Sequence, residues 1–217
     1  MEQNLAILIA DLSGYTALTE AHGSTTAADL VDKFVDITND CLCGDSHLHS
    51  RTGDEVVIIS TSADDLVTTA ILMMQKTTGE GNFLQLHGGL HYGKILKRNN
   101  NYFGTTINLA SRIANTAKPG TFWCSEEFIN ALSEKAAFTF HARDKHSFKN
   151  LSVEKEMFEV LIERDLCHID PVCRMLINNI DNAITHPHKK NIFFCSAECL
   201  EIYLKSKISE KEFKESQ

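Results

Sequence analysis

The pattern of apolar and polar residues predicts a buried strand near the start of the chain. Residues 5–10 form an unbroken apolar run that ends at Asp11, in a turn that contains Ser13 and Gly14. A short apolar run closed by turn residues is typical of a buried strand. A helix with an apolar face at helical spacing is predicted after Gly23. Asp11 is therefore expected where a central strand opens onto a loop, an edge at which sheets commonly bind ligands.

Similar patterns predict the elements that follow. Gly53 and Asp54 lie between two strand-like segments, which is the pattern of a tight hairpin. Ser62 with Asp65 three residues later predicts the start of a helix. Further strands or helices are predicted at 83–96, 108–115, 121–124, after Ser125, at 138–148 and at 156–162. The order strand–helix–strand–strand–helix–strand predicts an α+β chain with a ferredoxin-like βαββαβ arrangement and its helices on one side of the sheet.

Composition and charge restrict the possible partners. The chain has 217 residues, enough for one medium domain and a small one, and 43% of them are hydrophobic. Its formal net charge is −8 and no long basic run is present, which disfavours nucleic acid or an anionic membrane surface as a partner. No apolar segment approaches the length of a membrane span, and the N-terminus lacks a signal peptide's features, so we expect a cytoplasmic protein.

Two aspartates are candidates for binding a metal ion. Asp11 and Asp54 each stand beside a glycine turn and each adjoin a predicted core strand. Mg²⁺ is commonly bound by one or two carboxylates, with substrate phosphates completing its shell. The pair therefore predicts a site for hard divalent cations. The alternative is that each is a turn aspartate that accepts hydrogen bonds from nearby N–H groups.

A third stretch, residues 101–112, reads Asn-Tyr-Phe-Gly-Thr-Thr-Ile-Asn-Leu-Ala-Ser-Arg. With the segments around Asp11 and Asp54, it resembles the catalytic domain of class III adenylate and guanylate cyclases. That family carries Asp-x-x-Gly-[Phe/Tyr]-Thr, a Gly-Asp hairpin and Tyr-Phe-Gly-x-x-[Val/Ile]-Asn-x-Ala-[Ala/Ser]-Arg. The resemblance covers roughly residues 4–163 and predicts a cyclase domain at 1–164. It implies that ATP or GTP is converted to the 3′,5′-cyclic monophosphate and pyrophosphate in intracellular signalling.

The resemblance implies a role for each matching residue. Asp11 and Asp54 would hold two Mg²⁺ or Mn²⁺ ions per active site, and the backbone carbonyl of Leu12 would add a further oxygen. Asn108 would orient the ribose, and Arg112 would stabilise charge that grows on the α-phosphate. The last two are four residues apart, which places them on one face of a helix. An asparagine cap and a surface arginine are the alternative interpretation.

Other positions concern the triphosphate and the base. Gly14 would let the backbone approach a phosphate chain, and Lys149 matches the family's triphosphate-binding lysine or is a solvated loop residue. Ser50 and Asn101 stand where adenylate cyclases have a lysine and an aspartate. Serine and asparagine both donate and accept hydrogen bonds, so the purine stays open. These departures also leave open an alternative, a catalytically weak or inactive regulatory protein that binds nucleotide or senses metal.

The resemblance also implies a homodimer. In this family one chain contributes the aspartates and the other contributes the asparagine and the arginine. We therefore expect two equivalent shared sites in a two-fold symmetric dimer. The expected ligand is a nucleoside triphosphate, and neither nucleic acid nor a membrane is an expected partner.

The composition changes in residues 165–217, which we predict to be a second, metal-binding domain with a charged C-terminal end. Four of the seven cysteines follow residue 166. The segments Asp-Pro-Val-Cys-Arg-Met and Phe-Phe-Cys-Ser-Ala-Glu-Cys resemble the YHS domain, a small metal-associated module, over roughly residues 167–206. Arg174 replaces the glycine of that family's first segment.

Cysteine spacing indicates a soft-metal site in this part of the chain. Cys195 and Cys199 are four residues apart, and Cys173 comes 22 residues before Cys195, a workable loop. Together they fit a tetrahedral site for Zn²⁺ or another soft metal, with Cys167 or His168 as a possible fourth ligand. The alternative is a set of reduced, buried cysteines.

Overall fold

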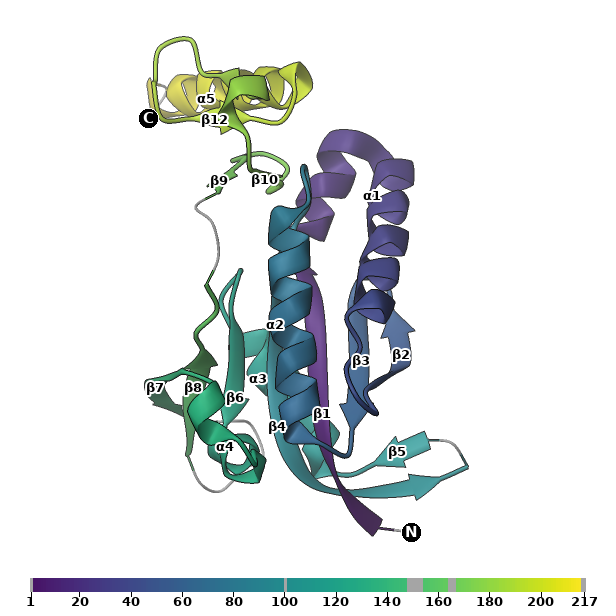
Figure 1. Cartoon of the computed structure of the whole chain (residues 1–217). Helices are drawn as coiled ribbons and strands as arrows, with labels where there is room; N and C mark the ends of the chain where they lie inside the picture. The colour runs from purple at the N-terminus through teal and green to yellow at the C-terminus, as the bar shows by residue number, and fades with distance from the viewer. Residues whose placement is uncertain (1, 100, 148–153, 164–166, 216–217) are drawn as a thin grey trace.

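A single buried strand runs through the centre of the protein. The computed structural model describes residues 2–99, 101–147, 154–163 and 167–215, and its first element is β1 (Glu2–Ser13). Antiparallel partners lie on both sides of β1, namely β3 (Glu55–Ser60) and β4 (Gln85–Arg98). The apolar run predicted as a buried strand therefore has neighbours on both edges, which explains why it carries so few polar side chains (Figure 1).

The remaining elements follow in chain order. They are α1 (Tyr15–Asp40), β2 (His47–Thr52), α2 (Ala63–Gly79), β5 (Asn101–Phe103), α3 (Thr105–Thr116), β6 (Phe122–Ser125), α4 (Glu126–Ala131), the 3₁₀ helix Lys135–Ala137, β7 (Phe140–His146), β8 (Lys155–Val160), β9 (His168–Ile169), β10 (Leu176–Ile177), the 3₁₀ helix Ile180–Asn182, β11 (Ile184–Thr185), β12 (Phe193–Phe194) and α5 (Ala197–Glu215). No helix in the described ranges is both long enough and apolar enough to cross a membrane.

The main sheet has the predicted ferredoxin-like core. Its strand order is β2-β3-β1-β4-β6-β8-β7, and β5 pairs with β4. The first four strands and the helices α1 and α2 occur in the order βαββαβ, which confirms the predicted arrangement. The predicted hairpin is also confirmed, because Gly53 and Asp54 connect β2 to β3. Strands β6, β8 and β7 extend this core along one edge.

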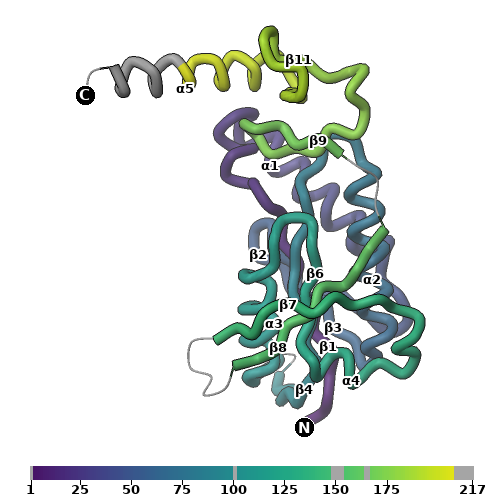
Figure 2. Tube along the Cα trace, turned by 90° about the vertical axis from the view of Figure 1, so that its left-hand side faces the viewer, coloured from purple at the N-terminus to yellow at the C-terminus, as the bar shows by residue number. Residues whose placement is uncertain are grey.

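The helices cover both faces of the sheet, so the prediction that they lie on one side is wrong. Side chains alternate along a strand, and the even-numbered apolar residues of β1 pack with α1, α2 and α4. The odd-numbered residues Leu5, Ile7 and Ile9 pack with Ala110 and Ala114 of α3. Both faces of β1 are apolar, so each face requires a cover. Figure 2 shows α2 and α3 on opposite sides of the strands.

The first helix begins earlier than the sequence predicts. Gly14 lies directly before Tyr15, so α1 starts immediately after β1 and not after Gly23. Gly23 has φ 84° and ψ 165°, which breaks α1 into two parts at a kink. A helix part does begin after Gly23, as predicted, but another precedes it. The predicted start of α2 is confirmed, because the Ser62 hydroxyl accepts a hydrogen bond from the backbone N–H of Asp65 at 3.1 Å.

The C-terminal segment packs on the end of the sheet where α1 begins (Figure 1). Met175 forms a β-bridge with Leu84, and the backbone N–H of Leu176 donates to the Phe83 carbonyl at 2.6 Å. Met175 and Leu84 belong to one buried apolar cluster that continues into the main core. The C-terminal segment therefore shares its core with the sheet domain.

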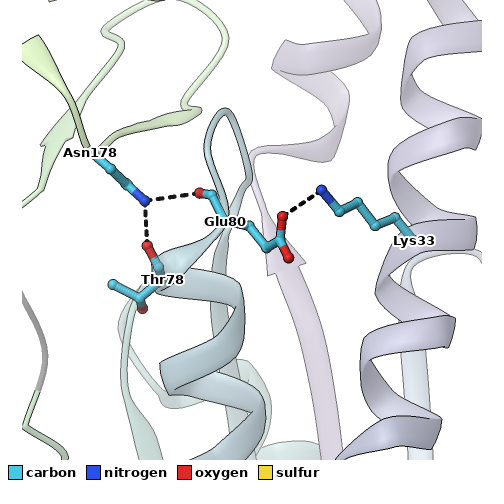
Figure 3. A network of polar contacts seen from close by, with 4 residues as sticks. All are labelled: Lys33, Thr78, Glu80 and Asn178. Atoms are coloured by element: carbon cyan, nitrogen blue, oxygen red, sulfur yellow. Dashed lines mark hydrogen bonds and ion pairs between the residues drawn. The ribbon is translucent and has the colours of Figure 1, made fainter. Parts of the chain in front are cut away.

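A polar network supports the same contact. The Asn178 side-chain amide donates to the backbone carbonyls of Thr78 and Glu80 at 2.7 and 3.0 Å (Figure 3). The Glu80 carboxylate in turn pairs with Lys33 of α1. Asn178 thus satisfies two carbonyl groups at the C-terminal end of α2, where a helix leaves carbonyls without partners of its own.

Replacing Gly89 with alanine tests how closely α3 packs on β4. An added Cβ would lie 2.3 Å from the backbone N of Ala114 and 2.5 Å from the backbone O of Ala110. Backbone atoms cannot move aside as side chains do, so we expect the free energy of unfolding to fall by about 3 kcal/mol, the upper end of typical overpacking costs. Urea unfolding can be followed by the fluorescence of Trp123, which packs against Leu109 of α3.

Gly79→Ala is the matched control. No atom lies within 4 Å of a Cβ added at this residue, which ends α2. We expect its unfolding midpoint to be unchanged or slightly raised, because alanine has the higher helix propensity. Equal midpoints for Gly89→Ala and the wild type would contradict the close packing of α3.

Candidate functional site

The β1 register brings Asp11 and Asp54 together. Ala10 pairs with Val56 of β3, so the next residue of β1 reaches the hairpin turn that carries Asp54. The two carboxyl groups are near enough for each to shift the pKa of the other. Two acids that are 43 residues apart in the sequence therefore form one acidic site at the end of the central strand.

The electrostatics of this pair are unfavourable without a cation. Burial raises the pKa of Asp11, and the nearby Glu55 carboxylate adds to the effect. Burial also raises the pKa of Asp54, and the charge of Asp11 raises it further. Among the described residues, no hydrogen-bond partner reaches the buried Oδ1 of Asp11. A divalent cation would bind this oxygen and would also reduce the repulsion between the two carboxylates.

His87 is also part of this site, although no sequence motif indicates it. It pairs with Asp11 across β1 and β4. Its Nδ1 lies 2.8 Å from the Ser13 hydroxyl, and its Nε2 lies 4.0 Å from Oδ2 of Asp11. Burial lowers the pKa of His87. The sequence gives no local signal for it, because a histidine in a strand acquires its neighbours only through strand pairing.

The turn between β1 and α1 lies beside the acidic pair. Gly14 has φ 100° and is the N-cap residue of α1, which leaves the first backbone N–H groups of the helix near the end of β1. Leu12, which follows Asp11 in β1, is buried. A Cβ placed on Gly14 would lie 2.5 Å from the Cβ of Arg174. The C-terminal segment therefore packs directly against this turn.

Asn108 and Arg112 lie on the outer surface of α3. The buried residues of α3 are Thr106, Leu109, Ala110, Ile113 and Ala114. Asn108 is exposed and Arg112 is half-buried, so both occupy the helix surface that faces away from the sheet. Their spacing places them on one face, as the sequence predicts.

The remaining predicted residues are distributed as follows. Ser50 is exposed on β2, next to a bulge in its pairing with β3. Asn101 begins β5, which pairs with the end of β4. Lys149 lies outside the described residues.

A second cluster gathers soft metal ligands. Cys173, Cys195 and Cys199 come together as the sequence predicts, and the fourth member is His22 of α1. The four potential ligand atoms all lie within 4.8 Å of one another. Among the described residues, Cys167 and His168 are not part of this group. No local pattern indicates His22 as a ligand, because it precedes Cys173 by about 150 residues.

The surroundings of two of these cysteines disfavour the thiolate form. The hydrogen bond to Cys173 and burial raise the pKa of Cys195, and burial raises the pKa of Cys199 to about 12. Neighbouring buried thiolates repel one another, and a bound cation removes this repulsion.

Comparison with known proteins identifies the domain that carries the acidic site. Residues 1–163 match the family model of the adenylate and guanylate cyclase catalytic domain. An adenylate cyclase of Glutamicibacter nicotianae is 28% identical over 140 residues, which cover 64% of this chain and 35% of that protein. An uncharacterized protein of Mycobacterium tuberculosis is 33% identical over 126 residues, 58% of this chain and 33% of that protein. The chain thus spans about a third of the length of these curated relatives.

A solved structure has the same fold. The adenylyl cyclase CyaB of P. aeruginosa superposes with a TM-score of 0.63 at 17% sequence identity, covering 76% of this chain and 96% of that one. At this identity the likeness concerns the fold alone. The family model ends before the cysteine cluster, since Cys173 and the residues after it follow residue 163.

Asp54→Asn tests whether the carboxylates repel one another. In EDTA at neutral pH we expect a higher melting temperature than for the wild type, because one of two like charges is removed. The folded-state pKa of Asp54 is raised, so ionising Asp54 destabilises the fold. This destabilisation is absent below the ordinary carboxylate pKa and grows as the pH rises through the raised pKa. The difference should therefore shrink on acidification. Mg²⁺ or Mn²⁺ should raise the melting temperature of the wild type more than that of the variant.

Asp64→Asn is a control for which we expect the opposite change in melting temperature. Although burial opposes it, hydrogen bonds from Ser133 and Glu134 lower the pKa of Asp64. This stabilisation is present above the ordinary pKa and is lost as the pH falls, so the variant should melt below the wild type at neutral pH. An Asp54→Asn protein that also melts lower in EDTA would contradict the repulsion at the acidic pair.

Proposed function

The chain belongs to the adenylate and guanylate cyclase catalytic domain family, and we propose that it converts ATP or GTP to the 3′,5′-cyclic monophosphate and pyrophosphate. The observation that carries the proposal is the buried Asp11 carboxylate oxygen beside Asp54, to which the described part of the chain offers no hydrogen-bond donor. A structural aspartate in a turn would have its oxygens satisfied by nearby N–H groups. A buried pair of carboxyl groups with an unsatisfied oxygen is instead suited to binding a divalent cation.

We propose that Asp11 and Asp54 hold two Mg²⁺ or Mn²⁺ ions, with the Leu12 carbonyl as a further ligand. Bound there, the ions would favour ionisation of the ribose 3′-hydroxyl and neutralise charge on the triphosphate. The Gly14 turn would present the N-terminus of α1 to the phosphates, where free N–H groups and the helix dipole favour an anion. His87 would hold the acidic site in position through Ser13 and through its approach to Asp11.

We propose that a second copy of the chain supplies Asn108 and Arg112. Both occupy the surface of α3 that faces away from the sheet, and the packed face of α3 covers the side of β1 to which Asp11 belongs. Asn108 would orient the ribose, while the planar fork of Arg112 would bind oxygens of the α-phosphate as charge develops there. The exposed apolar pair Leu96 and Phe103, opposite one another on β4 and β5, fits a surface covered in a dimer.

The residues proposed to contact the base are compatible with both adenine and guanine. Ser50, together with Asn101 and Lys149, is proposed to bind the base and the triphosphate on the grounds of the sequence motifs. Ser50 is exposed on β2, where it is accessible to a ligand. A serine that both donates and accepts hydrogen bonds is compatible with either purine.

A catalytically weak or inactive regulatory protein is the second candidate function. The observation that favours it is the contact between Arg174 and the Gly14 turn, which places the C-terminal segment against the proposed phosphate site. In that case nucleotide binding would be measurable while product would not form.

We further propose that residues 165–217 form a YHS-like module that binds Zn²⁺ or another soft metal through Cys173, Cys195 and Cys199. Three cysteines with ligand atoms close together match the ligands that zinc prefers. Arg174 supports the likeness, because its φ of 69° is the conformation that a glycine in this motif position adopts readily.

Product analysis separates the two candidate functions. Purified protein incubated with ATP or GTP and Mn²⁺ or Mg²⁺ should form the cyclic nucleotide and pyrophosphate, measured by chromatography and mass spectrometry. Arg112→Ala should lower kcat by about 100- to 1000-fold, the usual effect of removing one group that stabilises developing charge. Asn115→Ala, which changes an exposed residue of the same helix, is the control and should retain activity. Nucleotide binding without product in the wild type would favour the regulatory protein.

Complementation tests the shared site. Asp11→Ala and Arg112→Ala should each be inactive alone, because each spoils both sites of a homodimer. When the two are co-expressed, about half of the dimers are mixed and each mixed dimer has one intact site, so about a quarter of wild-type activity should return. Absence of recovery in dimers shown to be mixed by affinity tags would contradict a site built from two chains.

A further inference from the structure

Four potential metal ligands meet where the C-terminal segment packs on α1. His22 ends the first part of α1, Cys173 lies between β9 and β10, and Cys199 lies in the first turn of α5. Cys195 follows β12. We propose that these four residues bind one Zn²⁺-like ion, so that the metal links the cyclase domain to the C-terminal module. The inference rests on the metal-binding role proposed for the module and adds a ligand from the other domain.

Four of the six distances between the ligand atoms are close to the edges of a tetrahedron. For Zn–S bonds of about 2.3 Å and Zn–N bonds of about 2.0 Å, a tetrahedral ion has S···S edges of about 3.8 Å and S···N edges of about 3.5 Å. The Sγ atom of Cys195 lies 3.4 Å from that of Cys173 and 3.7 Å from that of Cys199. Nε2 of His22 lies 3.5 and 3.3 Å from the Sγ atoms of Cys195 and Cys199. These four edges fit one four-coordinate ion, and the edges from Cys173 to Cys199 and to His22 are no longer than 4.8 Å.

Neighbouring groups hold the cysteine loops in place. Asp170 is fully buried, and its carboxylate accepts hydrogen bonds from the backbone N–H groups of Cys173 at 3.2 Å and Cys195 at 2.7 Å. The Ser196 hydroxyl accepts a hydrogen bond from the N–H of Cys199 at 3.2 Å. Each of the three cysteines is thus fixed through its own backbone, which is how metal sites orient their ligands.

The kink at Gly23 positions His22. With φ 84° at Gly23, the first part of α1 ends at His22, and the Thr26 hydroxyl donates to the His22 carbonyl at 3.1 Å across the break. The alternative ligand His168 is exposed, and its ring packs against Phe193 at 4.5 Å. His22 and Cys195 also line a cavity of about 410 Å³, which gives an ion a route to the site.

The position of the metal connects it with the nucleotide end of the cyclase domain. Arg174, next to Cys173, packs against Gly14, and Met175 bridges to Leu84. Loss of the ion would release one of the links that hold this segment against the turn between β1 and α1. The metal would therefore stabilise the arrangement in which the module covers that turn.

Metal content and chelator competition in the full-length protein test the proposal. Wild-type protein saturated with zinc should hold about one ion per chain. His22→Ala should weaken zinc binding by about 100-fold or more, beyond the effect of losing an outer hydrogen bond. His22→Cys, which restores a fourth ligand, should recover most of the affinity. His168→Ala is the matched control and should bind as the wild type does. Cobalt substitution gives a second readout, because four-coordinate cobalt has a strong visible band that His22→Ala should alter and His22→Cys should shift toward an all-sulfur spectrum.

The outcomes distinguish this inference from the proposals on which it draws. If Cys199→Ser loses zinc while His22→Ala keeps wild-type affinity and the wild-type cobalt spectrum, then His22 is not a ligand, although the cysteine site stands. If His168→Ala loses zinc instead, the fourth ligand is the one that the sequence predicts, and the link to α1 is wrong. If wild-type protein binds no zinc after reduction and addition of the metal, both metal proposals fail, while cyclase activity is judged separately by product formation.

Discussion

The pairing of β1 with its two neighbours is the constraint on which the candidate active site depends. Its register with β3 brings Asp11 to the hairpin that carries Asp54, and its register with β4 places His87 opposite Asp11. A shift of one residue would turn Asp11 to the other face of the sheet. The buried apolar residues on both faces of β1 oppose such a shift, so the hydrophobic core keeps two repelling carboxylates in contact. A protein accepts such a destabilising arrangement where function requires it.

The position of α3 separates the two sets of groups that the proposed enzyme needs. Its apolar side covers Ile7 and Ile9, whereas Asn108 and Arg112 are left on the outer surface. The groups proposed to bind cations are therefore held by the sheet, and those proposed to bind the ribose and the α-phosphate are presented to another molecule. On this proposal one chain carries both sets of groups, but a complete site needs a second copy of the chain.

The C-terminal segment is joined to the sheet domain by more than the polypeptide chain. Met175 and Phe194 share a buried cluster with Leu84, and Asn178 satisfies carbonyl groups at the end of α2. These contacts place the module against the turn that is proposed to receive phosphates. Metal binding and nucleotide binding would thus act on neighbouring surfaces of α1. If one ligand prefers a particular arrangement of the module, its binding would change the affinity for the other ligand.

The sequence by itself determined the local features. A short apolar run closed by turn residues predicted β1, turn chemistry predicted the hairpin at Gly53 and Asp54, and a capping serine predicted the start of α2. The cysteine spacing predicted the three thiols that come together. All of these depend on residues near one another in the chain, where propensity and periodicity act directly.

Only the tertiary structure decided which distant residues meet. His87 joins Asp11 through strand pairing, and His22 joins the cysteines through the packing of the module on α1. The placement of α3 on the second face of the sheet was also decided at this level, because an apolar strand does not reveal which helix will cover it. Such contacts arise from the packing of whole elements, and no local pattern records them.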